Sequence, residues 1–260
     1  MSLSGLALLI TAVGALRAVA PDWVRVEMEP REPLQLAASA GKVLVAVYVG
    51  DEVATVAGRR GWFETGSRTV ELAVQILLPP EVEATIGGQT VTFVTQEAGA
   101  GPVFAAIDGL ISRAFGTPEA GAWGDRWAEF VEKISDDIEC RPFIAGETPS
   151  ARVPGLDMSI PCQVIGPPAP GAAAKPWLDL VAMMRADAYF DVQADFVAAM
   201  IQGEPVPPWR IELARAGLTR AEGTTLGVGV FAGLEDQPPV TRMTVETPRG
   251  PIVVEAEPAP

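Results

Sequence analysis

Histidine is absent from this chain of 260 residues, and its absence removes several kinds of site at once. Histidine is the commonest general base, the commonest metal ligand and the side chain that titrates near neutral pH. Cysteine is almost as scarce, since Cys140 and Cys162 are too few for a disulfide scaffold or a four-cysteine zinc site. We therefore expect no metal, no cofactor and two reduced thiols, with a single bridge only if the segments around both cysteines pair.

Clustered positive charge is also missing. The chain has 19 Lys and Arg against 33 Asp and Glu, a formal net charge of −14, and Arg59 and Arg60 are its only adjacent basic pair. Nucleic-acid binding needs clustered Lys and Arg that displace counterions from the phosphates. We therefore expect no direct contact with nucleic acid.

No apolar run is long enough to span a bilayer. The run near the N-terminus ends in Ala18-Val19-Ala20, which resembles a secretory cleavage site, but no basic residue precedes the run and Pro21 follows it directly. We expect no secretion signal and no membrane contact. Our interpretation is an amphipathic helix with one apolar stripe, formed by Leu3, Leu6, Ile10 and Val13.

Two apolar segments joined by a polar, arginine-bearing connector stand out between Lys42 and Leu78. Val43–Val49 is apolar on both faces, which is typical of a central strand. The second segment alternates, and one of its faces consists of Val70, Leu72, Val74, Ile76 and Leu78. Its other face carries Glu71, Ala73 and Gln75. This pattern predicts a sheet with one buried face.

The rest of the chain gives a coarse order of elements. Expected strands lie at 23–28, 138–144, 156–165, 209–213, 225–231, 242–246 and 252–255, and a hairpin turns at Gly87-Gly88. Expected helices run from Pro102 to Phe115, from Trp123 to Ile134 and from Pro176 to about Gln202. This order predicts an α+β fold: a mostly antiparallel sheet flanked by helices on one face, with a C-terminal extension of helix and strands.

The composition also divides the chain. Residues 1–166 form the predicted first domain, with a hairpin insertion at about 81–97. The Pro- and Ala-rich segment 167–175 is the clearest linker, and residues 176–260 form the C-terminal extension.

No phosphate-binding loop, nucleophile elbow or zinc motif occurs in the sequence. Asp125, Asp136 and Asp137 are the candidates for a hydrolase or transferase that uses carboxylates alone. Side chains of adjacent aspartates diverge, and no third oxygen ligand recurs at a metal-binding spacing. We therefore expect no enzyme activity and keep the carboxylate-dependent hydrolase as the alternative from another class.

The order of elements over residues 1–166 resembles the tail terminator proteins of long-tailed bacteriophages. The resemblance is carried by Val43–Tyr48 (VLVAVY), by Arg59-Arg60 with the segment that starts at Arg68 (RTVELAV), and by the helical segment Pro102–Phe115. The hairpin at 85–95 and the residues after the linker depart from the small members of that family. Because of those departures, the resemblance does not specify which residues would contact one another within a ring.

The resemblance implies a virion structural protein of the phage neck, assembled in the host cytoplasm. Such a subunit forms a homohexameric ring on the head-proximal end of the tail tube, ends tube polymerisation and joins the tail to the head connector. Its partners would be further copies of itself, the tail tube protein and a connector or stopper protein. Another neck protein, such as a head-tail stopper or adaptor, is the near alternative.

The connector between the two central strands is the expected assembly contact. Aromatic side chains beside arginines have the composition of interface anchors, although these aromatics could equally fold back onto their own sheet. The candidate interface residues are Arg59, Arg60, Trp62, Phe63, Glu64 and Arg68.

Overall fold

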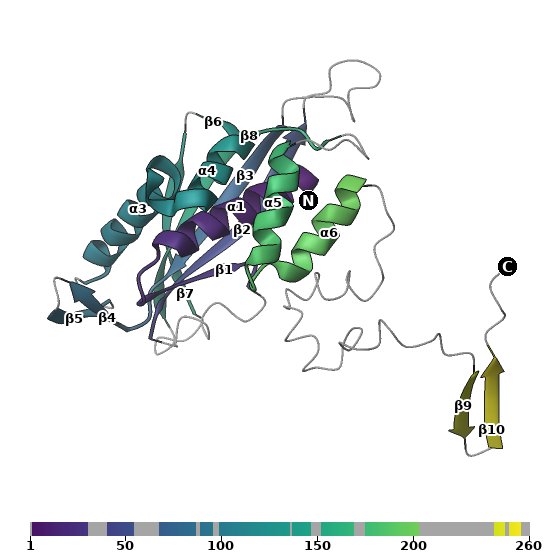
Figure 1. Ribbon diagram of the computed structural model, residues 1–260. Coiled ribbons are helices and arrows are strands. Elements are labelled where there is room, and N and C mark those ends of the chain that lie inside the picture. The colour runs from purple at the N-terminus through teal and green to yellow at the C-terminus, as the bar shows by residue number, and fades with distance from the viewer. Residues whose placement is uncertain are drawn as a thin grey trace.

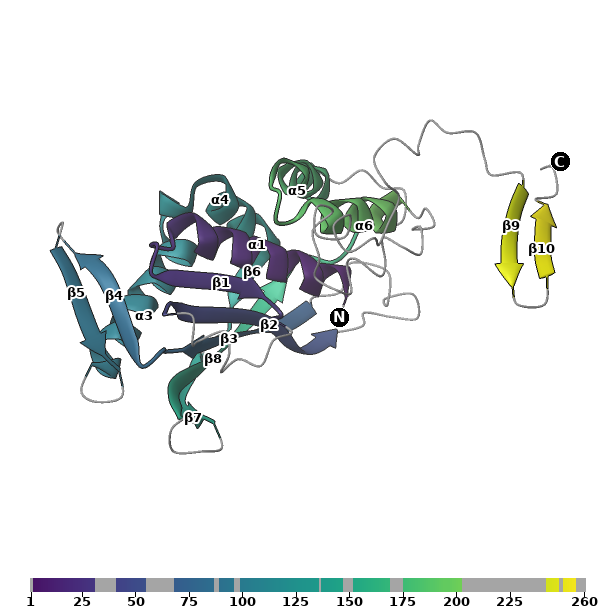
Figure 2. The same ribbon diagram turned by 90° about the horizontal axis from the view of Figure 1, so that it is seen from below.

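The computed structural model describes residues 2–30, 41–54, 68–86, 89–95, 99–135, 137–146, 152–168, 175–202, 242–247 and 250–255. Over these ranges the protein has an α+β fold, in which helices lie on one side of a six-stranded, mostly antiparallel sheet (Figures 1 and 2). The predicted fold class is confirmed. Among the described helices, none combines the length and the hydropathy that crossing a membrane requires.

The six-stranded sheet has the order β1-β2-β3-β8-β6, and β7 also pairs with β8. Only the pairing of β1 with β2 is parallel. β6 and β7 pair one after the other along the same edge of β8, with Val131 opposite Val164 and Glu139 opposite Ser159. The strands are β1 (Val24–Met28), β2 (Val43–Ala54), β3 (Arg68–Leu77), β6 (Val131–Ile134), β7 (Glu139–Ala145) and β8 (Val153–Val164).

The alternating pattern of β3 places its residues as predicted. Val70, Leu72, Val74 and Ile76 are all buried in the main core, and β2 lies between β1 and β3 as the central strand. β2 is longer than its apolar segment because its polar end, up to Ala54, still pairs with Arg68 at the start of β3.

Two hairpins stand apart from this sheet. β4 (Glu81–Ile86) and β5 (Gln89–Val94) pair antiparallel, which confirms the hairpin predicted around Gly87-Gly88. β9 (Arg242–Thr247) and β10 (Gly250–Glu255) form the second hairpin. Strands were expected at both positions, at 242–246 and 252–255. The strands expected at 209–213 and 225–231 lie outside the described residues.

The helices are α1 (Leu3–Val19), α3 (Ala100–Gly116), α4 (Gly121–Phe130), α5 (Lys175–Ala186) and α6 (Asp191–Gln202), with a 3-10 turn η1 (Pro118–Ala120). α1 was expected to be amphipathic, and this is wrong: it is buried on all sides from Leu3 to Leu16, except at Leu6. It contacts the sheet on one side and α3 and α4 on the other. Its buried hydroxyls are satisfied, since Ser4 Oγ donates to Ile165 O at 2.9 Å and Thr11 Oγ1 donates to Ala7 O at 2.8 Å.

The helix expected from Trp123 to Ile134 ends earlier, at Phe130. The chain then becomes extended, because Val131–Ile134 completes the edge of β8 and the Ile165 N–H donates to Phe130 O at 3.0 Å. Sheet pairing here overrides the helical spacing of the apolar residues. Trp127 and Phe130 are buried as expected, whereas Ile134 is exposed.

The single helix expected from Pro176 to Gln202 is two helices, α5 and α6. Asp187 breaks the pattern, since its side-chain Oδ1 accepts the Tyr189 N–H at 2.9 Å and its carbonyl accepts the Phe190 N–H at 3.0 Å. Aspartate competes in this way with helical hydrogen bonds. The turn lets Phe190 enter the core and lets the Tyr189 hydroxyl accept the Met28 N–H at 3.0 Å.

Aromatic contacts attach α5 and α6 to the rest of the core. Phe130 and Trp177 meet edge to face with ring centroids 4.8 Å apart, and Trp123 lies 5.2 Å from Phe190. Tyr189 also lies beneath the Arg17 guanidinium, 3.8 Å from its ring centroid. Residues on both sides of the predicted linker 167–175 therefore contribute to one buried cluster.

Gly14 allows α1 and α4 to approach closely. A Cβ at this position would lie 2.4 Å from the Trp123 ring. Gly109 on α3 is the contrasting case, because a Cβ there would meet no atom within 4 Å.

We expect Gly14→Ala to lower the free energy of unfolding by about 1–3 kcal/mol, because the new methyl group overpacks the contact with Trp123. The control Gly109→Ala should raise that free energy by up to about 1 kcal/mol, since alanine favours a helix and the space is open. Urea unfolding followed by tryptophan fluorescence measures both. Equal effects of the two substitutions would contradict the close packing of α1 and α4.

Candidate functional site

The sheet has one face that no described helix covers, which we call the open face (Figure 2). Its residues follow from strand register. One cross-strand row consists of Tyr48, Ala73, Ser159 and Glu139, from β2, β3, β8 and β7 in turn. The neighbouring row consists of Glu27, Ala46, Gln75, Asp157 and Arg141. The open face therefore gathers polar side chains from five strands that are far apart in sequence.

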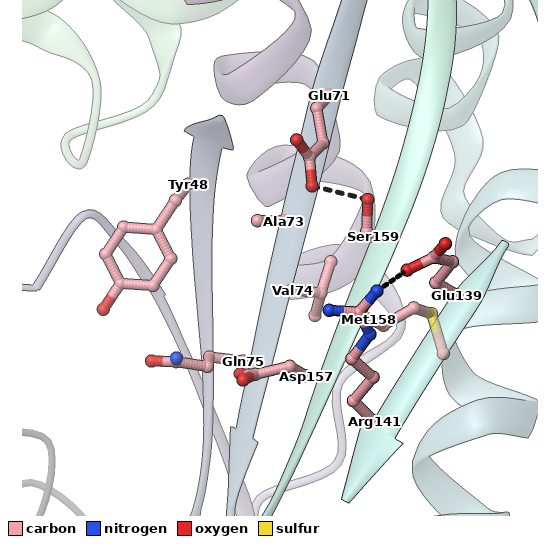
Figure 3. Close-up of a pocket in the computed structure, with 10 residues that line it drawn as sticks. All are labelled: Tyr48, Glu71, Ala73, Val74, Gln75, Glu139, Arg141, Asp157, Met158 and Ser159. Carbon is pink, nitrogen blue, oxygen red and sulfur yellow. Dashed lines mark hydrogen bonds and ion pairs between the residues drawn. The ribbon is translucent and has the colours of Figure 1, made fainter. Parts of the chain in front are cut away.

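A cavity of about 390 Å³ lies on the open face, where these two rows meet. Figure 3 shows Tyr48 and Gln75 on one side of it, Glu139 and Arg141 on the other, and Glu71 above. Ala73 lies between the larger residues, and its single methyl group leaves the space that a longer side chain would fill. We call this space the open-face cavity.

Three carboxylates and one guanidinium line the open-face cavity. Arg141 forms an ion pair with Glu139 on its own strand. Glu71 Oε1 accepts a hydrogen bond from Ser159 Oγ at 2.5 Å. Asp157 differs from both, because its buried Oδ1 finds no hydrogen-bond partner in the described part of the protein. The cavity is therefore negative overall and contains one carboxylate oxygen that is desolvated but unsatisfied.

Tyr48 is neutral at the edge of this cavity. Burial raises the pKa of its hydroxyl above the usual value, and the nearby carboxylates Glu29, Asp157 and Glu27 raise it further. The phenol can therefore donate one hydrogen bond, accept others and offer an aromatic face.

The other end of the open face is apolar. Leu44, Leu77 and Val153 form a small second cluster there, and the Phe143 ring packs against it. Phe143 lies over its cross-strand partner Gly155, where a Cβ would be 2.4 Å from the ring. Leu44, Leu77 and Phe143 of this cluster occupy the cross-strand row that follows the row of Gln75 on the open face.

Of the predicted interface residues, only Arg68 lies within the described part of the chain. Its Nη1 donates to Glu52 Oε1 at 2.7 Å, and the Ser2 N–H donates to Glu52 Oε2 at 3.0 Å. These contacts join the last residues of β2 and the first residue of β3 to the residue that precedes α1. Burial opposes ionisation of the Glu52 carboxyl, but its hydrogen bonds with Ser2 and Arg68 outweigh burial and lower its pKa.

The remaining sequence-based candidates are not brought together by the described structure. Arg59, Arg60, Trp62, Phe63 and Glu64 lie outside the described residues, as does Asp136. Asp125 is on α4 and Asp137 follows β6, on separate elements. No group of three Asp, Glu, Cys or His side chains in the described ranges could hold a metal ion.

The two cysteines differ in environment. Both are free thiols; Cys140 is exposed on β7, whereas Cys162 is fully buried on β8. Burial raises the pKa of the Cys162 thiol to about 12.

Sequence reasoning missed the open-face cavity. The alternation of 69–78 already set Glu71, Ala73 and Gln75 on the face opposite the core. The signal that was lacking is register, because only pairing shows that Asp157 and Arg141 lie beside Gln75.

No protein-family model matches this chain, and comparison with curated proteins finds no match. A functional proposal therefore depends on the chain's own residues and on the resemblance in its order of elements.

Acid unfolding tests the contacts of Glu52. Because the folded state binds the Glu52 proton less tightly than the unfolded chain, these contacts stabilise the fold above the ordinary glutamate pKa of about 4.3. That stabilisation is lost as the pH falls through the lower folded-state pKa. We expect Glu52→Gln to lower the free energy of unfolding at neutral pH by about 1–3 kcal/mol.

The difference between wild type and Glu52→Gln should disappear at low pH in urea titrations. Glu83→Gln, at an exposed position on β4, is the matched control and should change the free energy by less than about 0.5 kcal/mol. A constant difference between wild type and Glu52→Gln at all pH values would show that the carboxylate charge is not responsible.

Thiol labelling tests the two cysteine environments. With a disulfide reagent at mildly alkaline pH, we expect the native protein to react rapidly at Cys140 alone, because only a thiolate reacts and Cys162 is buried and protonated. Denaturation should release the second thiol, and Cys140→Ser should abolish the native reaction. Failure of both thiols to react after denaturation would reveal a disulfide instead.

Proposed function

We propose that this protein is a ring-forming structural subunit of the tail terminator type. In this role it caps the head-proximal end of a phage tail tube, ends tube polymerisation and joins the tail to the head connector. The proposal rests on the resemblance carried by the segments that contain β2, β3 and α3, and on the surfaces that these elements leave available.

The observation that carries the proposal is the one-sided sheet. Helices cover one face, and the open face carries charged and aromatic side chains from β2, β3, β7 and β8. A subunit of a closed ring needs a rigid core and two different surfaces for its neighbours. A one-sided sheet supports this by combining a core packed on one side with an extended polar surface on the other.

The base of the connector 55–67 is a second support. The hydrogen bonds among Ser2, Glu52 and Arg68 fix the residues from which the connector leaves β2 and returns to β3. Side-chain exposure is 12% for Arg68 and 17% for Glu52, so solvent screens this pair less than a surface ion pair. An assembly contact on the connector would therefore begin from a rigid base.

The charge of the subunit bears on how a ring would form. A net charge of −14 makes free subunits repel one another, and salt screens such repulsion. Assembly is therefore expected to be favoured by added salt or by the end of a tail tube acting as a template.

The proposal predicts a hexamer with a mass six times 27.3 kDa in native mass measurements, and a larger hexamer fraction at higher ionic strength. Added to growing tail tubes, the protein should stop their elongation. The double substitution Arg59→Ser with Arg60→Ser should reduce both effects, since it removes both positive charges of the connector. Arg152→Ser, at an exposed position before β8, is the control and should leave both unchanged.

Continued elongation of the tubes would refute the terminator role. A hexamer that binds a head connector but does not stop tube growth would instead identify a stopper or adaptor. A strict monomer at high concentration and high salt would contradict ring formation itself.

A further inference from the structure

We propose that the open-face cavity is a binding site for a guanidinium group, supplied by an arginine side chain of a partner protein. The inference goes beyond the assembly role proposed above and does not depend on ring formation. It rests on the lining of the cavity, on the unsatisfied oxygen of Asp157 and on the shape set by Ala73.

The charge of the cavity selects a cation. Glu139 is already neutralised by Arg141, so Glu71 and Asp157 are the carboxylates left to interact with a ligand. Asp157 Oδ1 is buried and has no hydrogen-bond partner in the described ranges. A carboxylate that is partly shielded from water is costly, and a cation that enters the cavity offsets this cost by interacting with its negative charge.

The spread of acceptors favours a guanidinium over a compact ammonium. Tyr48 and Asp157 lie two strands apart, on β2 and β8, and two residues apart along the strands, which separates their Cα atoms by about 12 Å at the usual strand spacing and rise. Figure 3 shows the Glu71 carboxylate next to Ala73, the Asp157 carboxylate farther along the cavity beside Gln75, and the Tyr48 ring on the flank. A planar group with five N–H donors can reach several of these acceptors at once, whereas an ammonium is a point charge.

The aromatic wall supports the same ligand. Tyr48 offers a ring face on which a guanidinium can stack, and burial together with the nearby carboxylates raises the pKa of its phenol further above neutral pH. A metal ion is a poorer fit, because no three acidic, cysteine or histidine side chains in the described part of the chain converge closely enough.

Calorimetric titration of the full-length protein with N-acetyl-arginine amide tests the proposal. This probe presents an arginine side chain without charged termini. Its matched control is N-acetyl-citrulline amide, which has the same shape but a neutral urea group. We expect saturable binding of the arginine probe and at least tenfold weaker binding of the citrulline probe, since hydrogen bonds to charged groups are much stronger than neutral ones.

Substitutions locate the site. Asp157→Asn should weaken binding about tenfold or more, and Ala73→Leu should abolish it by filling the cavity. Asp108→Asn removes a carboxylate from an exposed position on α3 and is the control, with binding unchanged. Arg141→Gln should bind the probe at least as tightly as wild type, because it removes a competing positive charge from the lining.

Three results would overturn the proposal: no saturable binding of the arginine probe, equal binding of the citrulline probe, or unchanged binding by both Asp157→Asn and Ala73→Leu. Thermal unfolding shows whether each variant is folded. If Asp157→Asn does not fold, the binding measured for Ala73→Leu tests the proposal. Tight binding of agmatine without binding of the arginine probe would assign the cavity to a free organic cation and refute the side-chain source. Hexamer formation is measured separately, so failure here leaves the ring proposal intact.

Discussion

Burial of α1 is the interaction on which the rest of the structure depends. The helix exposes almost no side chain between Leu3 and Leu16, so other elements must cover it from every side. The sheet covers one side, and α3 and α4 cover another. Because these helices must all lie near α1, they gather on one face of the sheet. The open face is consistent with this packing, since α3 and α4 already lie against α1 and α5 lies against α4.

The open face is where the protein departs from a simple packed core. Side chains that point away from α1 are free to be polar, and strand register brings Tyr48, Glu71, Asp157 and Arg141 together around Ala73. Arg141 forms an ion pair with Glu139, and Glu71 accepts a hydrogen bond from the Ser159 hydroxyl. Asp157 is the exception, because its buried Oδ1 has no hydrogen-bond partner in the described ranges, and for this reason we propose a cationic ligand for the cavity.

Local patterns predicted the parts of the fold that are decided locally. The alternation from Val70 to Ile76 set the buried face of β3, and Gly87-Gly88 marked a hairpin. The errors occur where a distant contact competes with a local preference. Val131 continues a helical stripe, yet it pairs with Val164 because the edge of β8 is available. Asp187 interrupts a long helical pattern, and the turn is stabilised when Phe190 packs beside Trp123.

The sequence by itself determined which residues share a face of each strand, because side chains alternate along an extended backbone whatever the neighbouring strands are. It also determined the acidic charge and the lack of histidine chemistry. Only the tertiary structure decided which strands are neighbours, and with them the cavity, because register depends on long-range pairing that one strand cannot specify. Arg68 shows the difference: its charge and position were evident from the sequence, but its pairing with Glu52 depends on the register of β2 against β3.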